Sequence, residues 1–303
     1  MAVVATSGPR ALLRRWHRRR PEPSMLDLIQ GHRIAAAIHV AARLGIADVL
    51  AAGPRTPGEI ALRVDADPDG VRRLLRALAA VEIFAVRPDG RYELTPQADT
   101  LRADHPESLR PAALFWGGPP QWENWGTLLD VVREGAPVVP APQGGDEPVG
   151  PPEPVVAAYD FTGTGTVVEV GGRGELLAAV LRAAPHARGT LHDPAEGPLP
   201  ADADCYLLKN VLHDHPEAPA LRILRGVREA IAPHGRLLVV EAVLPEGNTP
   251  HPAKMTDLEK LLTVGGRERT ERDHRALLAQ AGFELARIIP TASPLSILEA
   301  LPA

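Results

Sequence analysis

Three glycines directly behind a predicted strand could bring the backbone close to a nucleotide cofactor. In VVEVGGRGE, residues 167–175, the apolar run ends at Gly171, Gly172 and Gly174, and LLAAVLRAA follows with helical periodicity. A strand that breaks on glycines and restarts as a helix is typical of cofactor-binding turns in α/β folds, because glycine permits close approach and the helix N-terminus is positive. VGGRG is not GxGxxG, so the turn alone does not choose among nucleotide cofactors.

Histidine and carboxylate side chains further along the chain could perform acid–base chemistry. They are His213 and Asp214 in LHDH, Glu241 in VVEAVLP and Glu268 in GGRERT. A neutral imidazole suits proton transfer because its unperturbed pKa lies near neutral pH. Taken singly, a histidine at a strand end is usually a surface residue without a functional role, and a glutamate such as Glu268 could cap a helix. His213, Asp214 and His215 are consecutive and could contribute to a metal site, but no third ligand is identifiable, so we predict no bound metal.

The second half of the chain holds the elements that must position these residues. Strands are predicted at 166–170, 189–193, 205–211, 235–244, 284–291 and 296–300, and helices at 175–184, 217–231 and 270–282. Strands that alternate with helices indicate a mainly parallel, doubly wound α/β sheet. Its ligand is expected at the carboxyl ends of the strands.

The first half of the chain predicts a small helical domain of winged-helix type. Helical patterns run over 25–53, 56–64 and 67–84, and FAVRPDGRYELT, residues 84–95, is a hairpin pattern. Winged helices can bind DNA through a basic helix, and this one carries arginines at 72, 73 and 76. Aspartates at 65, 67 and 69 and the net charge of -5 oppose phosphate binding. We therefore predict no nucleic-acid partner, and a domain that dimerises and covers the substrate.

Composition sets the remaining limits. With 303 residues, 45% hydrophobic and 23% charged, the chain is long enough for two globular domains and has no apolar run that would span a membrane. Its one cysteine, Cys205, is expected to be a buried thiol in a reducing compartment, and we expect a cytoplasmic protein. The predicted organisation is a basic flexible arm at 1–24, a winged-helix domain at 25–134, a Pro/Gly-rich linker at 135–154 and a catalytic domain at 155–303.

The motifs together resemble a known family. Residues 207–247, which include LHDH and VVEAVLP, and residues 265–300, which begin with GGRERT, closely resemble bacterial small-molecule O-methyltransferases similar to the plant caffeate-type enzymes. The first half resembles that family's winged-helix dimerisation domain, so the resemblance covers nearly everything from Met25 onward. It implies a Rossmann-like class I methyltransferase sheet, the cofactor S-adenosylmethionine (SAM), a homodimer formed through the N-terminal helices, and a small aromatic or polyketide-type substrate from secondary metabolism such as antibiotic biosynthesis.

The resemblance also implies roles for the acid–base residues. His213 would be the general base that takes the proton from the substrate hydroxyl, and Glu241 and Glu268 would flank and orient it. A carboxylate at a histidine keeps the correct ring nitrogen free and stabilises the imidazolium as it forms. Asp214 would help to position the substrate.

On the cofactor side, the resemblance implies that the turn beneath the methionine part of SAM is formed by Gly171, Gly172 and Gly174, with Glu169 at the strand end. It also implies that Asp193 binds the ribose hydroxyls and that Lys209 reaches the cofactor. A carboxylate suits the vicinal hydroxyls of any ribose, so Asp193 supports a nucleoside without choosing SAM; its alternative role is to form a turn before Pro194. The aromatic residues of FWGGPPQWENW, in particular Trp116, Trp122 and Trp125, would contribute to an aromatic-friendly substrate wall, although tryptophans this close together often belong to a core.

The sequence departs from the family pattern in three places. Arg173 stands where a further glycine is common, and the proline-rich linker replaces a helical stretch. Between Asp193 and Asp204 only PAEGPLPADA remains, which is too short for a crossover and another strand, so we predict that one edge strand is missing. Three hypotheses follow: SAM-dependent methyl transfer; SAM-independent cyclisation, elimination, decarboxylation or rearrangement on a scaffold with a degenerate cofactor site; or a catalytically silent partner in a heterodimer.

Overall fold

The computed structural model describes residues 23–137 and 150–303. The chain divides into two compact units, Met1–Pro119 and Pro120–Ala303. The predicted arm, up to residue 22, and residues 138–149 of the predicted linker lie outside the described residues. The finer boundaries at residues 24, 134 and 154 remain predictions.

The first unit consists of helices and one antiparallel hairpin. Its elements are α2 (Met25–Ile29), α3 (Gly31–Arg43), α4 (Ile46–Ala51), α5 (Pro57–Val64), α6 (Pro68–Ala80), β1 (Phe84–Val86), β2 (Tyr92–Leu94), α7 (Pro96–Asp99) and α8 (Arg110–Trp116). Strands β1 and β2 pair antiparallel, as the hairpin pattern predicts. The prediction of one helical run over 25–53 is wrong in detail, because the chain leaves the helix at Gln30 and again at Gly45, whose φ of 68° is left-handed.

Local sequence explains where the central helices of this unit begin. The Thr56 hydroxyl oxygen accepts a hydrogen bond from the backbone N–H of Glu59, and the Glu59 carboxylate accepts one from the backbone N–H of Thr56, which is a capping box. Asp67 caps α6 through the backbone of Gly70. The buried faces of these helices meet in one apolar core, whose largest fully buried side chains are Ile46, Ile60, Leu75, Leu78 and Phe84. The winged-helix order therefore has a core of its own.

The second unit is built on a mainly parallel sheet with the strand order β4-β3-β5-β6-β10-β9. The strands are β3 (Thr166–Val170), β4 (Arg188–His192), β5 (Cys205–Lys209), β6 (Arg236–Glu241), β9 (Phe283–Pro290) and β10 (Ser296–Pro302). The pairs β3–β4, β3–β5 and β5–β6 are parallel, whereas β10 is antiparallel to both β6 and β9. Two short strands, β7 (Val243–Leu244) and β8 (Arg269–Thr270), pair separately.

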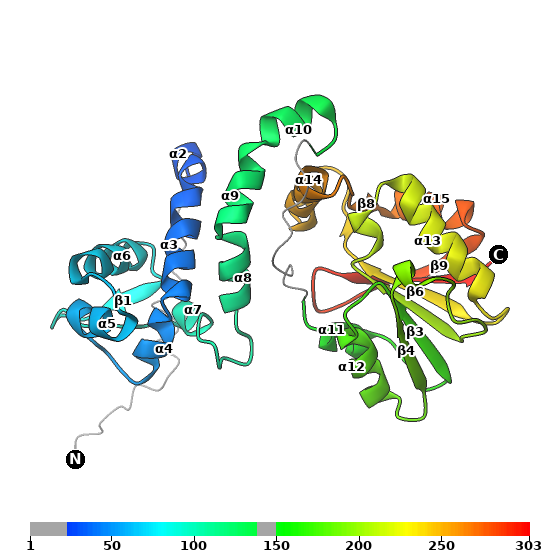
Figure 1. The fold of residues 1–303 in the computed structure, drawn as a ribbon, viewed down its shortest axis with the longest axis horizontal. Helices are drawn as coiled ribbons and strands as arrows, with labels where there is room; N and C mark the ends of the chain where they lie inside the picture. The colour runs from blue at the N-terminus through cyan, green and yellow to red at the C-terminus, as the bar shows by residue number, and fades with distance from the viewer. Residues whose placement is uncertain (1–22, 138–149) are drawn as a thin grey trace, which may run out of the picture. The chain divides into compact units, whose positions relative to one another are not determined.

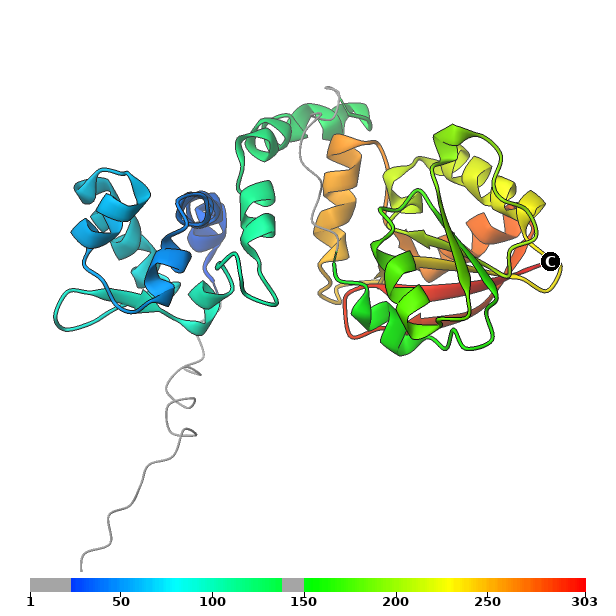
Figure 2. The same ribbon diagram turned by 60° about the horizontal axis from the view of Figure 1, so that its bottom comes forward.

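Helices cover both faces of this sheet, as a doubly wound fold requires (Figures 1 and 2). The helices of the unit are α9 (Pro119–Gly126), α10 (Leu128–Glu134), α11 (Glu153–Ala158), α12 (Glu175–Ala183), α13 (Glu217–Ala230), α14 (Ala253–Thr263) and α15 (Glu271–Gln280). Helices α13 and α15 pack on one face and α11 and α12 on the other, each over its own apolar cluster. Helices α7 to α11 and α14 were not among the elements predicted from the sequence.

The sheet ends at β4, and this confirms the predicted loss of an edge strand. Between Asp193 and Asp204 the chain forms only the short 3₁₀ helix η1 (Pro194–Glu196) before it enters β5. A groove of about 620 Å³ lies between this segment and α13, with Val170, His192 and Ile223 in its lining. The shortened connection therefore leaves part of the α13 face of the sheet uncovered.

Two further observations bear on the predictions from composition. Cys205 is fully buried in β5, as expected, and burial raises the pKa of its thiol to about 12. Within the two described stretches, no helix combines the length and apolar character needed to cross a membrane.

Candidate active site

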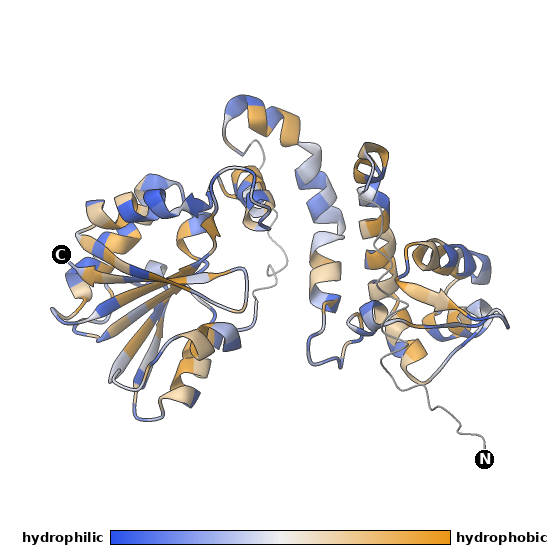
Figure 3. Ribbon diagram, turned by 180° about the vertical axis from the view of Figure 1, so that it is seen from behind, coloured by the Kyte–Doolittle hydropathy of each residue, from blue (hydrophilic) through white to orange (hydrophobic). Residues whose placement is uncertain are grey.

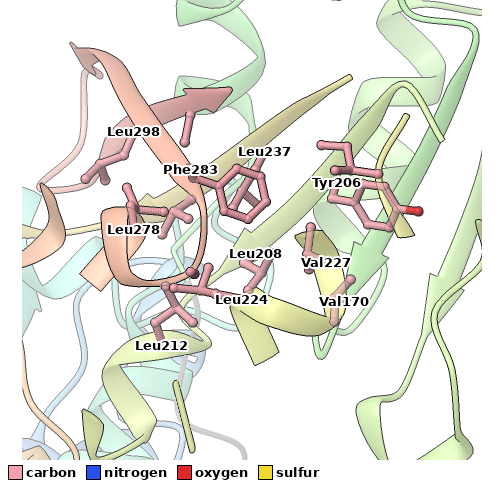
Figure 4. Packing of buried hydrophobic residues seen from close by; sticks show 14 of the residues in the cluster. Val170, Tyr206, Leu208, Leu212, Leu224, Val227, Leu237, Leu278, Phe283 and Leu298 are labelled. Atoms are coloured by element: carbon pink, nitrogen blue, oxygen red, sulfur yellow. The ribbon is translucent and has the colours of Figure 1, made fainter. Parts of the chain in front are cut away.

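His213 lies at the carboxyl end of the sheet, in the short 3₁₀ helix η2 (Leu212–Asp214) that follows β5. The predicted strand 205–211 ends early at Lys209, because Asn210 adopts a left-handed φ of 54° and turns the chain. Leu212, next to His213, is fully buried in the core cluster under α13, beside Leu224 (Figure 4). The apolar anchor at Leu212 therefore fixes where the histidine lies.

Both predicted glutamates contact His213. Nδ1 of His213 lies 2.9 Å from Oε1 of Glu268, and the backbone N–H of His213 donates to Oε1 of Glu241 at 3.0 Å. All three residues are at most 6% exposed. With the Glu268 carboxylate as acceptor, Nδ1 carries the proton and Nε2 is the nitrogen left to accept one. The predicted association of these three residues is therefore present in the structure.

The surroundings of His213 push its pKa in opposite directions. Burial alone would lower the pKa, but the hydrogen bond to Glu268 and the charges of Glu241 and Asp214 outweigh burial and raise it above 6.5. Burial raises the pKa of Glu241, since its charged form has lost its water. Among the described residues, no hydrogen-bond partner reaches the buried Oε2 of Glu241 or Oε2 of Glu268. Buried polar atoms normally have such a partner, so both carboxylates are only partly satisfied.

The chain that carries Glu268 also clamps the backbone around the histidine. The backbone N–H of Arg267 donates to the carbonyl of His213 at 2.9 Å, and the Arg269 guanidinium donates to the carbonyl of Leu212 at 2.8 Å. At Gly266 the chain passes so close that a Cβ there would lie 2.0 Å from the His213 carbonyl oxygen. The glycine of GGRERT is thus required by the close approach of two backbones.

Asp214 and Lys260 lie on the other side of the imidazole. Asp214 Oδ1 is 3.5 Å from His213 Nε2 and 2.8 Å from Nζ of Lys260. Lys260, on α14, is 4% exposed, whereas the Asp214 side chain is partly exposed. Asp214 therefore lies beside the imidazole of His213 and is held by a lysine.

The glycine turn after β3 has the geometry of a ligand cradle. Gly171 and Gly174 have φ values of 71° and 83°, and Gly174 is the N-cap of α12. A Cβ at Gly172 would lie 1.8 Å from Oε1 of Glu169, so a side chain there would displace that carboxylate. Oε2 of Glu169 accepts a hydrogen bond from the Leu177 backbone at 2.8 Å. The turn and the start of α12 are thereby locked together at the strand end.

Asp193 is brought next to this turn by strand pairing. Val170 pairs with His192 in the parallel register of β3 and β4, and the backbone N–H of Gly171 donates to the carbonyl of His192 at 2.9 Å. Asp193 is the next residue and is exposed. Two strand ends thus carry the glycine turn and an exposed carboxylate side by side, an arrangement that suits a nucleoside.

Lys209 ends β5 and is buried beneath the described end of the linker. Its Nζ donates to the carbonyl of Gly150 at 2.5 Å. Burial lowers its pKa, against the charges of Glu175 and Glu169. The side chain of Arg173, the departure within the turn, is exposed.

The three tryptophans belong to the helices around the division between the units. Trp116 ends α8 in the first unit and lines an apolar groove of about 640 Å³ together with Ile38, Ile83 and Leu109. Trp122 and Trp125 lie on α9, and the side chain of Trp122 is 38% exposed. A role for these tryptophans in substrate binding remains a prediction.

Sequence reasoning missed the residues that support the site from behind. Lys260 and Asp257 lie on α14, and the Asp257 carboxylate accepts a hydrogen bond from the Glu268 backbone at 2.8 Å. Their signal was the spacing in MTDLEKLL, where one helical turn places both residues on one face, but α14 itself was not predicted. In the described part of the chain, no group of three His, Cys, Asp or Glu side chains could hold a metal ion.

Comparisons with known proteins agree with this geometry. The O-methyltransferase domain model matches residues 195–284, and the O-methyltransferase dimerisation domain model matches residues 26–104. The phenazine O-methyltransferase PhzM of Lysobacter antibioticus is 35% identical, over 92% of this chain and 95% of that protein. The O-demethylpuromycin O-methyltransferase of Streptomyces alboniger is 34% identical, over 92% of this chain and 88% of that protein.

Solved structures give the same result. The crystal structure of the O-methyltransferase NcsB1 from neocarzinostatin biosynthesis, in complex with S-adenosylhomocysteine and 1,4-dihydroxy-2-naphthoic acid, has a TM-score of 0.74 and is 31% identical; it covers 94% of this chain and 100% of that one. Identity at this level over nearly the full length, with the site residues assembled, establishes the relationship. The chain belongs to the O-methyltransferase family, and it is a methyltransferase-family enzyme with an O-methyltransferase dimerisation domain.

Proposed function

We propose that this enzyme transfers a methyl group from SAM to a hydroxyl of a small aromatic or polyketide-type natural product, with His213 as the general base. The observation that carries the proposal is the 2.9 Å contact between His213 Nδ1 and Glu268 Oε1. With Glu268 accepting at Nδ1, Nε2 is the ring nitrogen left to take a proton. Relatives with the same architecture are named as O-methyltransferases of phenazine and puromycin-type compounds.

The proposed methyl transfer requires one proton transfer from the side chains of this protein. SAM, when bound, would supply an electrophilic methyl group on a sulfonium, whose S–C bond would break to leave S-adenosylhomocysteine as the O–C bond formed. The protein's own residues would then need only to accept the proton of the acceptor hydroxyl. Nε2 of His213 takes that proton, and the Glu268 carboxylate stabilises the resulting imidazolium. Glu241 fixes the histidine backbone. Because the site is buried, these charges act with little screening.

The residues at the strand ends fit SAM. The glycine turn leads into α12, whose N-terminus would offer its positive end to the carboxylate of the methionine part. Asp193 follows the strand paired with β3, where it would accept hydrogen bonds from both ribose hydroxyls. Lys209 lies at the end of the neighbouring strand β5. Because the segment after Asp193 is short, fewer protein groups are available to contact the adenine of SAM.

The enzyme is proposed to act as a homodimer through its N-terminal helices. Helix α2 exposes Met25, Leu26, Leu28 and Ile29 by 60–71% each. Helix α3 is hydrophobic along much of its length (Figure 3). Apolar side chains exposed in such numbers mark an interaction surface, and the matched domain is a dimerisation domain.

SAM-independent chemistry on the same scaffold is the less favoured hypothesis. The basis of this hypothesis was the short segment after Asp193, and the segment is short in the structure as well. However, relatives that match over about nine tenths of this chain are named as methyltransferases. A silent partner is also disfavoured, because the base and both glutamates are in contact.

The decisive experiment is a titration of the purified protein with SAM and S-adenosylhomocysteine by calorimetry, followed by incubation of methyl-labelled SAM with a panel of phenols, dihydroxynaphthoates and hydroxyphenazines. We expect micromolar binding and label transfer to at least one hydroxylated aromatic. The absence of binding up to millimolar concentration would refute SAM dependence and favour the SAM-independent hypothesis.

A further inference from the structure

Lysine is rare in this chain, and two of its three lysines are buried around the proposed active site. Of the 33 lysines and arginines in the chain, only three are lysines: Lys209, Lys254 and Lys260. Lys209 and Lys260 are 6% and 4% exposed. A buried ammonium needs a counter-charge, since its transfer out of water is expensive. At Lys260 that counter-charge is Asp214, at 2.8 Å.

The carboxylate of Asp214 has two competing attractions. The same oxygen, Oδ1, lies 2.8 Å from Nζ of Lys260 and 3.5 Å from Nε2 of His213. Glu268 already contacts the other ring nitrogen of His213 at 2.9 Å. If Asp214 moved onto Nε2, carboxylates would bind both nitrogens and hold the ring as an imidazolium, which cannot act as a base.

We propose that Lys260 is a positioning residue that draws Asp214 away from Nε2 of His213 and so keeps this nitrogen open to the acceptor hydroxyl. The inference rests on the proposed function, in which Nε2 receives the substrate proton. In this role Lys260 acts through Asp214, whose Oδ1 lies 2.8 Å from its Nζ.

The charges that face His213 agree with this assignment. Glu241 approaches from β6, Glu268 from the segment before β8, Asp214 from η2 and Lys260 from α14. Among these charges, the glutamates and Asp214 raise the pKa of His213, and Lys260 opposes them. Loss of the lysine therefore removes the opposing charge and also releases the carboxylate toward Nε2.

The test replaces the lysine with an apolar side chain of similar length. In K260M we expect the pKa of His213, followed by NMR on protein labelled with ¹⁵N-histidine and assigned with H213N, to rise by about one unit. The acid limb of the pH profile of kcat/KM moves to higher pH by the same amount. At pH values below this limb, kcat/KM therefore falls about tenfold, and it recovers at alkaline pH. The charge-conserving K260R retains the pair with Asp214 and keeps both values near those of the native enzyme.

A double-mutant cycle separates positioning from packing. In K260M/D214N the competing carboxylate is gone, so the pKa of His213 returns to the native value or below it. K254M, on the same helix, removes a lysine that contacts the Gly247 carbonyl and leaves the pKa of His213 unchanged. An unchanged pKa in K260M, or a double variant that behaves as K260M does, would overturn the inference.

The titration also distinguishes this inference from the proposed function. It uses the full chain without donor or acceptor, so it reports on Asp214 and His213 whether or not a methyl group is transferred. If the native protein transfers no methyl group while K260M still raises the pKa of His213, the proposed function fails and the control of Nε2 by Lys260 stands. If methyl transfer occurs but K260M changes neither pKa nor pH limb, only the inference fails.

Discussion

The carboxylate of Glu169 lies in the space that a side chain at Gly172 would need. A Cβ at Gly172 would be 1.8 Å from Oε1 of Glu169, while Oε2 holds the backbone of Leu177 at 2.8 Å. Burial raises the pKa of Glu169 despite this hydrogen bond. One buried side chain thus joins the end of β3, the glycine turn and the first turn of α12.

The first prediction concerns this contact. In G172A the new methyl group displaces the Glu169 carboxylate, and we expect a loss of roughly 1–3 kcal/mol in the free energy of unfolding, measured by urea denaturation. Binding of S-adenosylhomocysteine should weaken as well, because the turn can no longer keep its shape. G163A is a matched control, since a Cβ at Gly163 meets nothing within 4 Å. Equal stability of G172A and G163A would contradict the prediction.

The second prediction concerns recognition of the ribose. D193A should weaken binding of S-adenosylhomocysteine about 10- to 100-fold, because hydrogen bonds to a charged acceptor contribute roughly 1.5–3 kcal/mol. Calorimetry measures the change directly. E196A, in the same segment and also exposed, should bind as the native protein does. If both variants bind alike, Asp193 is only a turn residue before Pro194.

The third prediction concerns the base. H213A should lower kcat about 10²–10⁴-fold, as expected for loss of general-base catalysis, while the dissociation constant of S-adenosylhomocysteine stays within about twofold. H186A, at an exposed histidine, is the control for a general effect of removing an imidazole. Full activity of H213A toward an acceptor that is still protonated at the assay pH would exclude His213 as the base.

Much of the fold followed from local patterns, and the site followed from motifs. The glycine turn, the hairpin and the short segment after Asp193 were predictable because backbone chemistry and chain length determine them locally. The contact between His213 and Glu268 spans 55 positions, and no periodicity encodes it. It was inferred by resemblance, and it depends on a backbone approach at Gly266 that only the folded chain displays.

The role of Lys260 could not be predicted in the same way. A lysine in MTDLEKLL has the appearance of a solvated helix residue, and its burial results from the packing of α14 beside η2. Likewise, the helical run is interrupted at Gly45 because this one residue adopts a left-handed conformation, although the apolar pattern continues through it. Tertiary packing decides such cases, because the apolar period is compatible with one helix or several.

The last prediction follows from the pKa of Glu241, which burial raises above 4.5. The native state then retains a proton that the unfolded chain releases, so stability falls as pH rises from about 4.5 through the folded pKa. E241Q stays neutral while Oε1 can still accept from His213. We expect E241Q to match the native protein at pH 4.5 and to exceed its free energy of unfolding at pH 8, by about 1.4 kcal/mol for each unit by which folding raises the pKa of Glu241.

The matched control is E246Q, at an exposed glutamate, which should follow the native pH profile. Activity should respond in the opposite sense to stability. Because the Glu241 charge helps to raise the pKa of His213, E241Q moves the acid limb of kcat/KM to lower pH and weakens the base. A variant that gained stability at pH 8 without any shift of this limb would show that the Glu241 charge is not felt by the histidine. A variant that lost stability at both pH values would show that the carboxylate is needed for packing alone.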